Sequence, residues 1–184
     1  EIAIILGFSN WHEAIHAVRV VTPDPLSTAF PPGARPETLL QLPPEALQVA
    51  HLKQGLVVVS GPSGGGKRAV LEAFLREIWN RNTAPKAYAF DFFSPLAPDP
   101  QGIGQLHQVD SWSSSATLRE KTFSFLKRRP TDLFVAEVCD AHDLEVVTTN
   151  AMCGHMVWTS HPGDGRVSNS FRWMMSRFPQ EEHR

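Results

Sequence analysis

The chain has 184 residues, of which 42% are hydrophobic and 20% are charged, and its formal net charge is −2. These values are typical of a globular chain that holds one domain, or one domain and part of another, with a sizeable core. The small negative charge argues against a generally basic surface that coats nucleic acid, but it leaves room for a local basic strip at 127–129.

Cysteine content and hydropathy indicate the compartment. Cys139 and Cys153 lack the short spacing of a metal site, so we expect free thiols in a reducing compartment. No apolar run approaches the roughly 18 residues of a membrane helix, and no signal-peptide pattern is present. We therefore expect a cytoplasmic chain without a transmembrane segment that reaches any membrane through its partners. Because it starts at Glu1 and not at Met, we also expect it to be a piece of a longer protein.

The first 36 residues predict two short strands and a linker. The segments "IAIILGF" and "AIHAVRVV" are typical of strands, and a pair this short is not stable alone. We therefore expect residues 1–22 to be the end of an N-terminal domain. Residues 23–36 contain five prolines and are interpreted as an interdomain linker.

Residues 37–184 alternate between strand and helix patterns. The expected elements are a strand at 56–60, a helix at 67–80, a strand at 87–93, a helix from a capping box at Thr117 and Glu120 to about Arg129, a strand at 132–137, a helix from its cap Asp140 to Gly154, and a strand at 155–160. Strands separated by helices of this length predict a parallel α/β sheet.

The stretch "GPSGGGKR" lies between the first of these strands and the first of these helices. It fits the phosphate-loop pattern G-x-x-x-x-G-K-[ST] at Gly61, Gly66 and Lys67. The flanking strand and helix favour phosphate binding over a glycine-rich turn that precedes a lysine by chance. Lys67 is expected to reach the β and γ phosphates. The residues assigned to nucleotide binding here are Gly61, Pro62, Ser63, Gly64, Gly65, Gly66, Lys67 and Arg68.

Arg68 departs from the pattern, because a hydroxyl that holds magnesium is expected at its position. A guanidinium cannot bind a cation as a ligand, and the neighbouring Ala69 has no hydroxyl to replace it. We therefore expect metal binding to be weakened, or to be taken over by water and carboxylates. Alternatively, Arg68 itself neutralises phosphate charge.

Two acids at strand ends are candidate catalytic residues. Glu137 ends the apolar run "LFVAE", where phosphate-loop ATPases place the carboxylate that orients magnesium or the attacking water; a structural role is the alternative. Asp91 lies in "AYAFDFF" and either serves chemistry at the end of a strand or caps the following loop. Asp140 is better explained as the N-cap of a helix.

Two histidines flank the strand pattern "MVWTS". His155 follows Gly154 at a helix end, where an imidazole can satisfy free carbonyl groups. His161 follows the strand at the edge where open α/β sheets bind ligands. It is a candidate for sensing the terminal phosphate or for positioning water.

In this order, the motifs resemble those of the secretion ATPase superfamily, which includes the PilT-like motors of type IV pili and their relatives in type II and type IV secretion. The resemblance rests on "LPPEALQVAHLKQGLVVVSGPSGGGK", on "PTDLFVAEVCDAHDLEVVTTNAMCGHMVWTSHP" and on "SRFPQEEHR", and it covers about residues 14–184.

The resemblance implies a phosphate-loop, RecA-like motor core at 37–184, preceded by the last strands of a PAS-like domain and lacking the family's C-terminal helical domain. It also implies a homo- or hetero-hexameric ring that binds ATP and Mg²⁺, contacts inner-membrane platform proteins and does not bind nucleic acid directly. By position, residues 61–67 correspond to the Walker A loop and Glu137 to the Walker B acid. Asp91 falls in the aspartate box, Gly154, His155 and His161 fall in the histidine box, and Arg19 corresponds to a phosphate-contacting arginine.

Departures from the family pattern leave two functions open. Arg68 replaces the Walker A hydroxyl, the aspartate box keeps one acid, and Cys139 replaces an arginine. One interpretation is a motor subunit that couples ATP hydrolysis to pilus or secretion work. The alternative is a degenerate subunit that binds nucleotide or completes a ring beside an active paralogue. A small-metabolite kinase is disfavoured, because no arginine-rich lid segment is present.

Overall fold

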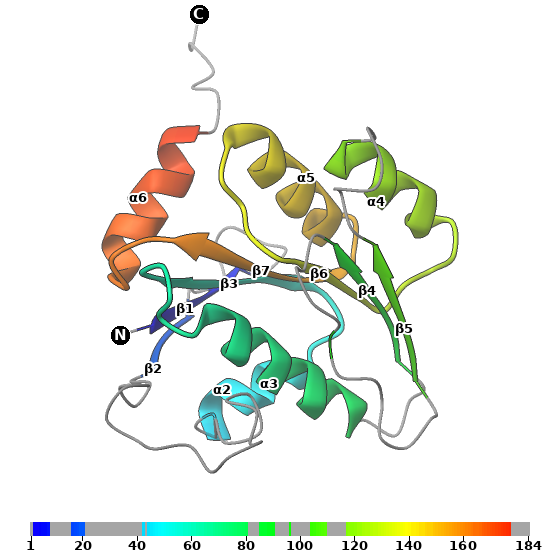
Figure 1. The fold of residues 1–184 in the computed structure, drawn as a ribbon, viewed down its shortest axis with the longest axis horizontal. Helices are drawn as coiled ribbons and strands as arrows, with labels where there is room; N and C mark the ends of the chain where they lie inside the picture. Colours follow the sequence, from blue (N-terminus) through cyan, green and yellow to red (C-terminus); the bar gives the residue numbers. More distant parts are fainter. Residues whose placement is uncertain are drawn as a thin grey trace, which may run out of the picture.

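The computed structural model describes residues 2–7, 16–20, 42, 44–80, 85–90, 96, 104–109 and 117–177. Seven strands in these ranges form one sheet in the order β2-β1-β3-β7-β6-β4-β5 (Figure 1). Their bounds are Ile2–Gly7 (β1), His16–Val20 (β2), Gly55–Gly61 (β3), Lys86–Phe90 (β4), Gln105–Val109 (β5), Asp132–Val135 (β6) and Met156–Pro162 (β7).

Five of these strands are parallel and carry the site. β3, β7, β6, β4 and β5 pair in parallel, so the carboxyl ends of β3, β6 and β7 meet at one edge. This arrangement confirms the predicted parallel α/β sheet. Folds of this class bind their ligands at the carboxyl ends of the parallel strands, where β3, β6 and β7 end together.

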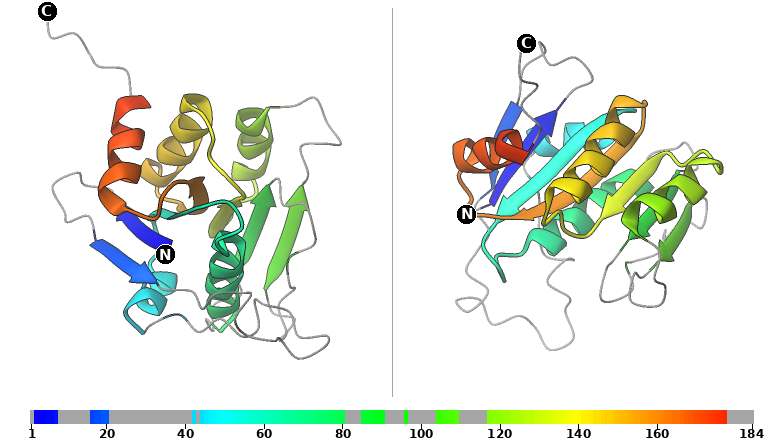
Figure 2. Two further views of the ribbon diagram at one scale, coloured as in Figure 1. Left: turned by 60° about the vertical axis from the view of Figure 1, so that its left-hand side comes forward. Right: turned by 90° about the horizontal axis from the view of Figure 1, so that it is seen from above.

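Helices cover both faces of the sheet (Figures 1 and 2). On one face lie α2 and α3, and on the other lie α4, α5 and α6. The bounds are Pro44–Gln48 (α2), Lys67–Trp79 (α3), Leu118–Leu126 (α4), Ala141–Met152 (α5) and Val167–Arg177 (α6), with a 3₁₀ turn at Val49–His51.

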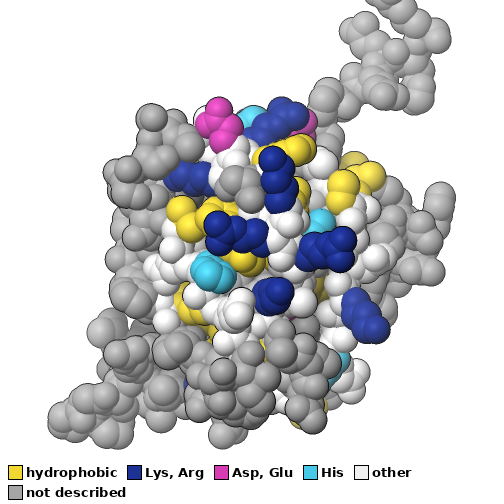
Figure 3. Space-filling view, turned by 90° about the vertical axis from the view of Figure 1, so that its right-hand side faces the viewer, with side chains coloured by type: hydrophobic (Ala, Val, Ile, Leu, Met, Phe, Trp, Pro, Cys, Tyr) yellow, Lys and Arg dark blue, Asp and Glu magenta, His cyan; other side chains and the backbone are white. Residues whose placement is uncertain are grey.

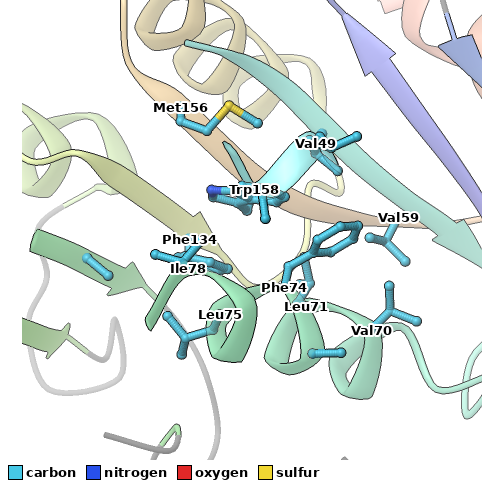
Figure 4. Packing of buried hydrophobic residues seen from close by; sticks show 14 of the residues in the cluster. Val49, Val59, Val70, Leu71, Phe74, Leu75, Ile78, Phe134, Met156 and Trp158 are labelled. Atoms are coloured by element: carbon cyan, nitrogen blue, oxygen red, sulfur yellow. The ribbon is translucent and has the colours of Figure 1, made fainter. Parts of the chain in front are cut away.

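The alternation of side chains along β3 divides the core into two layers. Val57 and Val59 pack on the α3 side, whereas Val58 packs on the side of α5 and α6, as the two-residue period of a strand requires. On the α3 side, the fully buried ring of Trp158 lies 4.9 Å from that of Phe74 and 5.7 Å from that of Phe134, measured between centroids (Figure 4). These aromatic contacts fix α3 against the sheet.

Trp158 also forms a hydrogen bond with a buried acid, Asp132. Its indole N–H donates a hydrogen bond of 3.0 Å to Oδ1 of Asp132, which is fully buried at the start of β6. Because a buried carboxyl group needs hydrogen-bond donors, this contact lets β6 begin inside the sheet with a polar residue.

The two N-terminal strands extend the same sheet. β1 pairs antiparallel with β3, and β2 pairs antiparallel with β1 at the edge. The predicted strand pair is therefore confirmed, and β3 is its structural support. The assignment of residues 1–22 to an N-terminal domain and of 37–184 to a core stays a prediction, and the linker 23–36 lies outside the described residues.

The basic segment at 127–129, which the net charge left possible as a local basic strip, is exposed. Lys127, Arg128 and Arg129 follow α4, and Lys86 is also exposed at the start of β4. Figure 3 shows Lys and Arg side chains gathered on the face bordered by β5 and α4. α4 ends at Leu126, short of the predicted end near Arg129, and Arg129 itself has a left-handed backbone with φ of 53°. In the part of the chain that the structure describes, no helix is both long and apolar enough to cross a bilayer.

We expect Phe74→Ala to lower the free energy of unfolding by about 3–5 kcal/mol, because it removes a fully buried ring between α3 and Trp158. Phe123→Ala is the matched control, since Phe123 is 64% exposed on α4 and its loss is expected to change stability by no more than about 0.5 kcal/mol. Urea unfolding of both variants checks this prediction. Equal losses in the two would contradict the described packing.

Candidate functional site

The glycine-rich loop forms a tight turn between β3 and α3. Gly64 and Gly66 have φ angles of 74° and 87°, which favour glycine. At Gly65, a Cβ would lie 3.0 Å from the carbonyl oxygen of Pro62, which accepts a hydrogen bond from the Gly65 amide. No side chain caps the start of α3, so its first amides face the loop without a side-chain acceptor. Such a turn can hold a phosphate group on backbone N–H groups.

Lys67 is held inside this turn. Its side chain is nearly buried, and its Nζ donates hydrogen bonds of 3.1 Å to the carbonyl of Gly61 and 3.2 Å to that of Pro62. The same Nζ lies 3.3 Å from Oε1 of Glu137. The structure therefore brings together the loop, the lysine and the acid that the sequence motifs single out.

β7 fixes the segment that carries Glu137. This residue follows β6, and its neighbours on both sides bond to Ser160 of β7. The Ser160 hydroxyl donates to the carbonyl of Ala136, and the Val138 amide donates to the carbonyl of Ser160 at 2.8 Å. These two hydrogen bonds hold the backbone on both sides of Glu137, and its half-exposed carboxylate lies next to Lys67.

Arg68 turns to an acid of its own helix. Its Nε donates a hydrogen bond of 2.6 Å to Oε1 of Glu72, one helical turn later. Glu72 is buried, and a buried carboxylate requires a charged or hydrogen-bonding partner. Arg68 therefore has a structural role as the partner of Glu72. Its contact with phosphate stays a prediction.

Magnesium does not fit this loop in the usual way. Position 68 supplies a guanidinium in place of an oxygen ligand, and Ala69 supplies none. Across the described ranges, no group of three or more His, Cys, Asp or Glu side chains is arranged to hold a metal ion. Glu137 is a carboxylate at the loop, and it already pairs with Lys67.

His161 lies at the carboxyl end of β7 in a closed environment. Its Nδ1 is 3.4 Å from the carbonyl oxygen of Val138, and its ring stacks on Trp173 of α6 with centroids 3.9 Å apart. Burial lowers the pKa of His161, and the Val138 carbonyl and the Glu137 carboxylate offset part of this effect. Since a carbonyl only accepts, the proton of the neutral ring in this contact is on Nδ1.

Other candidates have structural positions. His155 lies at the opposite end of β7, where its Nδ1 is 3.3 Å from the carbonyl of Asn150 at the end of α5, so the helix-end interpretation is confirmed. Asp140 accepts the amide of Asp143 and caps α5, as predicted. Cys139 is exposed beside Glu137, and partial burial together with nearby carboxylates raises its pKa.

Two predicted residues cannot be compared with the site. Asp91 lies outside the described residues. Arg19 lies in β2 opposite Ala3 of β1, at the edge of the sheet, and its side chain is not described. Their assigned roles stay predictions.

Sequence reasoning missed Gly163, in the turn between β7 and α6, and the α6 residues Ser170 and Trp173, all of which lie near the site. Ser170 and Met174 are buried four residues apart, and this helical spacing in "VSNSFRWMMSR" is the signal that indicates α6. Gly163 donates its amide to the carbonyl of Gly61 at 3.0 Å, which joins the α6 turn to the phosphate loop.

Comparisons with known proteins agree with this geometry. Residues 32–165 match the family model described as type II/IV secretion system protein. Type II secretion system protein E of Aeromonas hydrophila is 27% identical over 106 residues, which are 58% of this chain and 20% of that protein. The chain thus spans about a fifth of the length of this curated relative.

Solved ATPases share the fold. The pilus retraction motor PilT with bound ADP matches with a TM-score of 0.70 and 20% identity, over 79% of this chain and 42% of PilT. The Legionella pneumophila ATPase DotB matches with a TM-score of 0.68 and 22% identity, over 79% of this chain and 40% of DotB. Together with the family match, they confirm the resemblance seen in the motifs and the RecA-like fold of the parallel sheet.

We expect acidification to destabilise the chain through His161. Because burial favours its neutral form, the unfolded chain binds more protons below pH about 6.5, and stability falls as pH falls from there. The His161→Asn variant lacks this proton uptake, so it is expected to lose less stability than the natural chain between pH 7.5 and 5.5. Urea unfolding at both pH values checks this, and an identical pH dependence in both proteins would contradict the assigned environment.

Proposed function

Because the chain belongs to the type II/IV secretion system protein family, we propose that it is a nucleotide-binding subunit of a pilus or secretion motor, with ATP at the phosphate loop. The observation that carries this proposal is the position of Lys67, whose ammonium lies between two loop carbonyls and the Glu137 carboxylate. A lysine, a tight glycine turn and a strand-end acid in this arrangement suit a triphosphate.

Binding requires an exchange of partners at Lys67. The loop amides and the first turn of α3 receive the phosphate oxygens, and Lys67 turns from the carbonyls of Gly61 and Pro62 toward the same oxygens. This movement separates Lys67 from Glu137 and frees the carboxylate to orient a water molecule for attack on the terminal phosphate. His161 is held by Val138 and Trp173, so it acts in this scheme through the position of the Glu137 segment.

The proposed activity is ATP hydrolysis that drives pilus movement or protein transport. The second candidate is a subunit that binds nucleotide and completes a ring without hydrolysis, beside an active paralogue. The Arg68–Glu72 pair favours the second candidate, because it fills the position of the metal-binding hydroxyl. Family membership supports both candidates equally.

We further propose that the chain works in the cytoplasm as part of a homo- or hetero-hexameric ring that contacts platform proteins at the inner membrane. Family membership supports this placement. In such a ring, Asp91 contributes to the same site and Arg19 contacts phosphate; the family motifs support both roles.

We expect Lys67→Ala to weaken ATP binding about 10- to 100-fold, because it removes a charge-assisted contact of about 1.5–3 kcal/mol. Lys53→Ala is the control, since Lys53 is exposed before β3 and lies outside the loop. Isothermal titration calorimetry with ATP measures both. An unchanged affinity in Lys67→Ala would rule out the loop as the nucleotide site.

Arg68 is tested with a paired substitution, because Arg68→Ser alone leaves the buried Glu72 without its guanidinium partner. In Arg68→Ser/Glu72→Gln, we expect magnesium to raise phosphate release from ATP by about tenfold or more over the natural chain, as one restored polar group is worth about 10²–10³ in rate. Glu72→Gln alone is the control. If the natural chain already shows the magnesium response of the double variant, position 68 does not limit the site.

A further inference from the structure

The turn and helix that follow β7 are attached to the carboxyl end of β3, where the phosphate loop begins, by two hydrogen bonds. The Gly163 amide donates to the Gly61 carbonyl, and the hydroxyls of Ser170 and Ser60 form a buried hydrogen bond between α6 and β3. The approach is close, because a Cβ at Gly163 would lie 2.7 Å from the Ser60 hydroxyl oxygen. α6 is therefore seated against the end of the strand that leads into the loop.

The Gly61 carbonyl is the shared acceptor in this arrangement. It receives Lys67 Nζ at 3.1 Å and the Gly163 amide at 3.0 Å. Under the proposed function, phosphate binding draws Lys67 away from this oxygen. Gly61 is buried, and a buried carbonyl left without a donor is unfavourable. The Gly163 amide, which extends the β3–β7 pairing past Pro162, is the donor that stays, so contacts that hold the turn between β7 and α6 make the departure of Lys67 less costly.

Trp173 connects α6 to the segment that carries Glu137 through its contact with His161. Its ring stacks on His161 at 3.9 Å between centroids with an interplanar angle of 27°, and His161 contacts the Val138 carbonyl next to Glu137. The Arg177 guanidinium lies 5.4 Å from the centroid of the Trp173 ring. Trp173 thus reaches the carboxyl end of β7 through its contact with the His161 ring.

We propose that Trp173 is a positioning residue for nucleotide binding, which keeps Gly163 on the Gly61 carbonyl while Lys67 moves to the phosphates. The inference rests on the proposed function, since it assumes that ATP occupies the loop. It adds a reciprocal consequence: if a seated α6 favours ATP binding, bound ATP must stabilise the seated α6 to the same extent.

A purely structural role for Trp173 predicts a different result. Loss of the ring would then lower the stability of the chain and leave the affinity of the folded fraction for ATP unchanged. The two interpretations are therefore separated by affinity and by the response of α6 to ATP, and not by stability alone.

The experiment compares the natural chain with Trp173→Ala, Trp173→Phe and the control Met175→Ala, which changes an exposed side chain of the same helix. Calorimetry with ATP is expected to give a dissociation constant about tenfold weaker for Trp173→Ala, and within about twofold of the natural value for Trp173→Phe and Met175→Ala. In hydrogen exchange, ATP is expected to slow the amides from Gly163 to Ser170 about fivefold in the natural chain and not in Trp173→Ala.

The outcomes separate this inference from the function on which it rests. If the natural chain does not bind ATP, the proposed function fails and the inference fails with it. If the natural chain binds ATP and Trp173→Ala binds equally well, or if ATP leaves α6 exchange unchanged, the inference alone is overturned. If circular dichroism shows that Trp173→Ala does not fold, Ser170→Ala replaces it, because this variant removes the contact between α6 and Ser60. Ser170→Ala is also expected to weaken ATP binding.

Discussion

The buried ammonium of Lys67 is the group on which the arrangement of the site depends. In this structure, the ammonium contacts two loop carbonyls and the Glu137 carboxylate, and these acceptors come from two segments at the carboxyl ends of the parallel strands. β3 and its loop supply the carbonyls, the segment after β6 supplies the acid, and β7 holds that segment through Ser160. Under the proposed function, a phosphate ligand competes for the same ammonium, and its binding is then coupled to all three strands.

The arginine beside this lysine changes what the site can do. Arg68 and Glu72 form a pair of their own within α3, and no hydroxyl oxygen is present where the phosphate-loop pattern places a magnesium ligand. Under the proposed function, the loop thus keeps the groups proposed to bind phosphate and lacks one group that would support hydrolysis. This division is the physical basis for the two candidate functions. It also means that replacing Arg68 alone leaves the buried Glu72 carboxylate without its guanidinium partner.

Local patterns predicted much of the fold and site. β3, the glycine loop and α3 follow from an apolar run, the phosphate-loop pattern and an amphipathic stretch, and Thr117 and Asp140 cap their helices as expected. β5 was missed because "QLHQV" has one β-branched residue and gains its strand structure from pairing with β4. The contact of Trp173 with His161 arises from the way α6 folds back on the sheet, and the burial of Glu72 arises from packing. Neither follows from spacing alone.

A crystal structure of the chain with a non-hydrolysable ATP analogue tests the central claim most directly. The account predicts the triphosphate in the turn between Gly61 and Lys67, with Lys67 Nζ within about 3.2 Å of a phosphate oxygen and beyond about 4 Å from the Gly61 carbonyl. A triphosphate bound elsewhere, or a Lys67 that stays on the Gly61 carbonyl with the analogue bound, would contradict it.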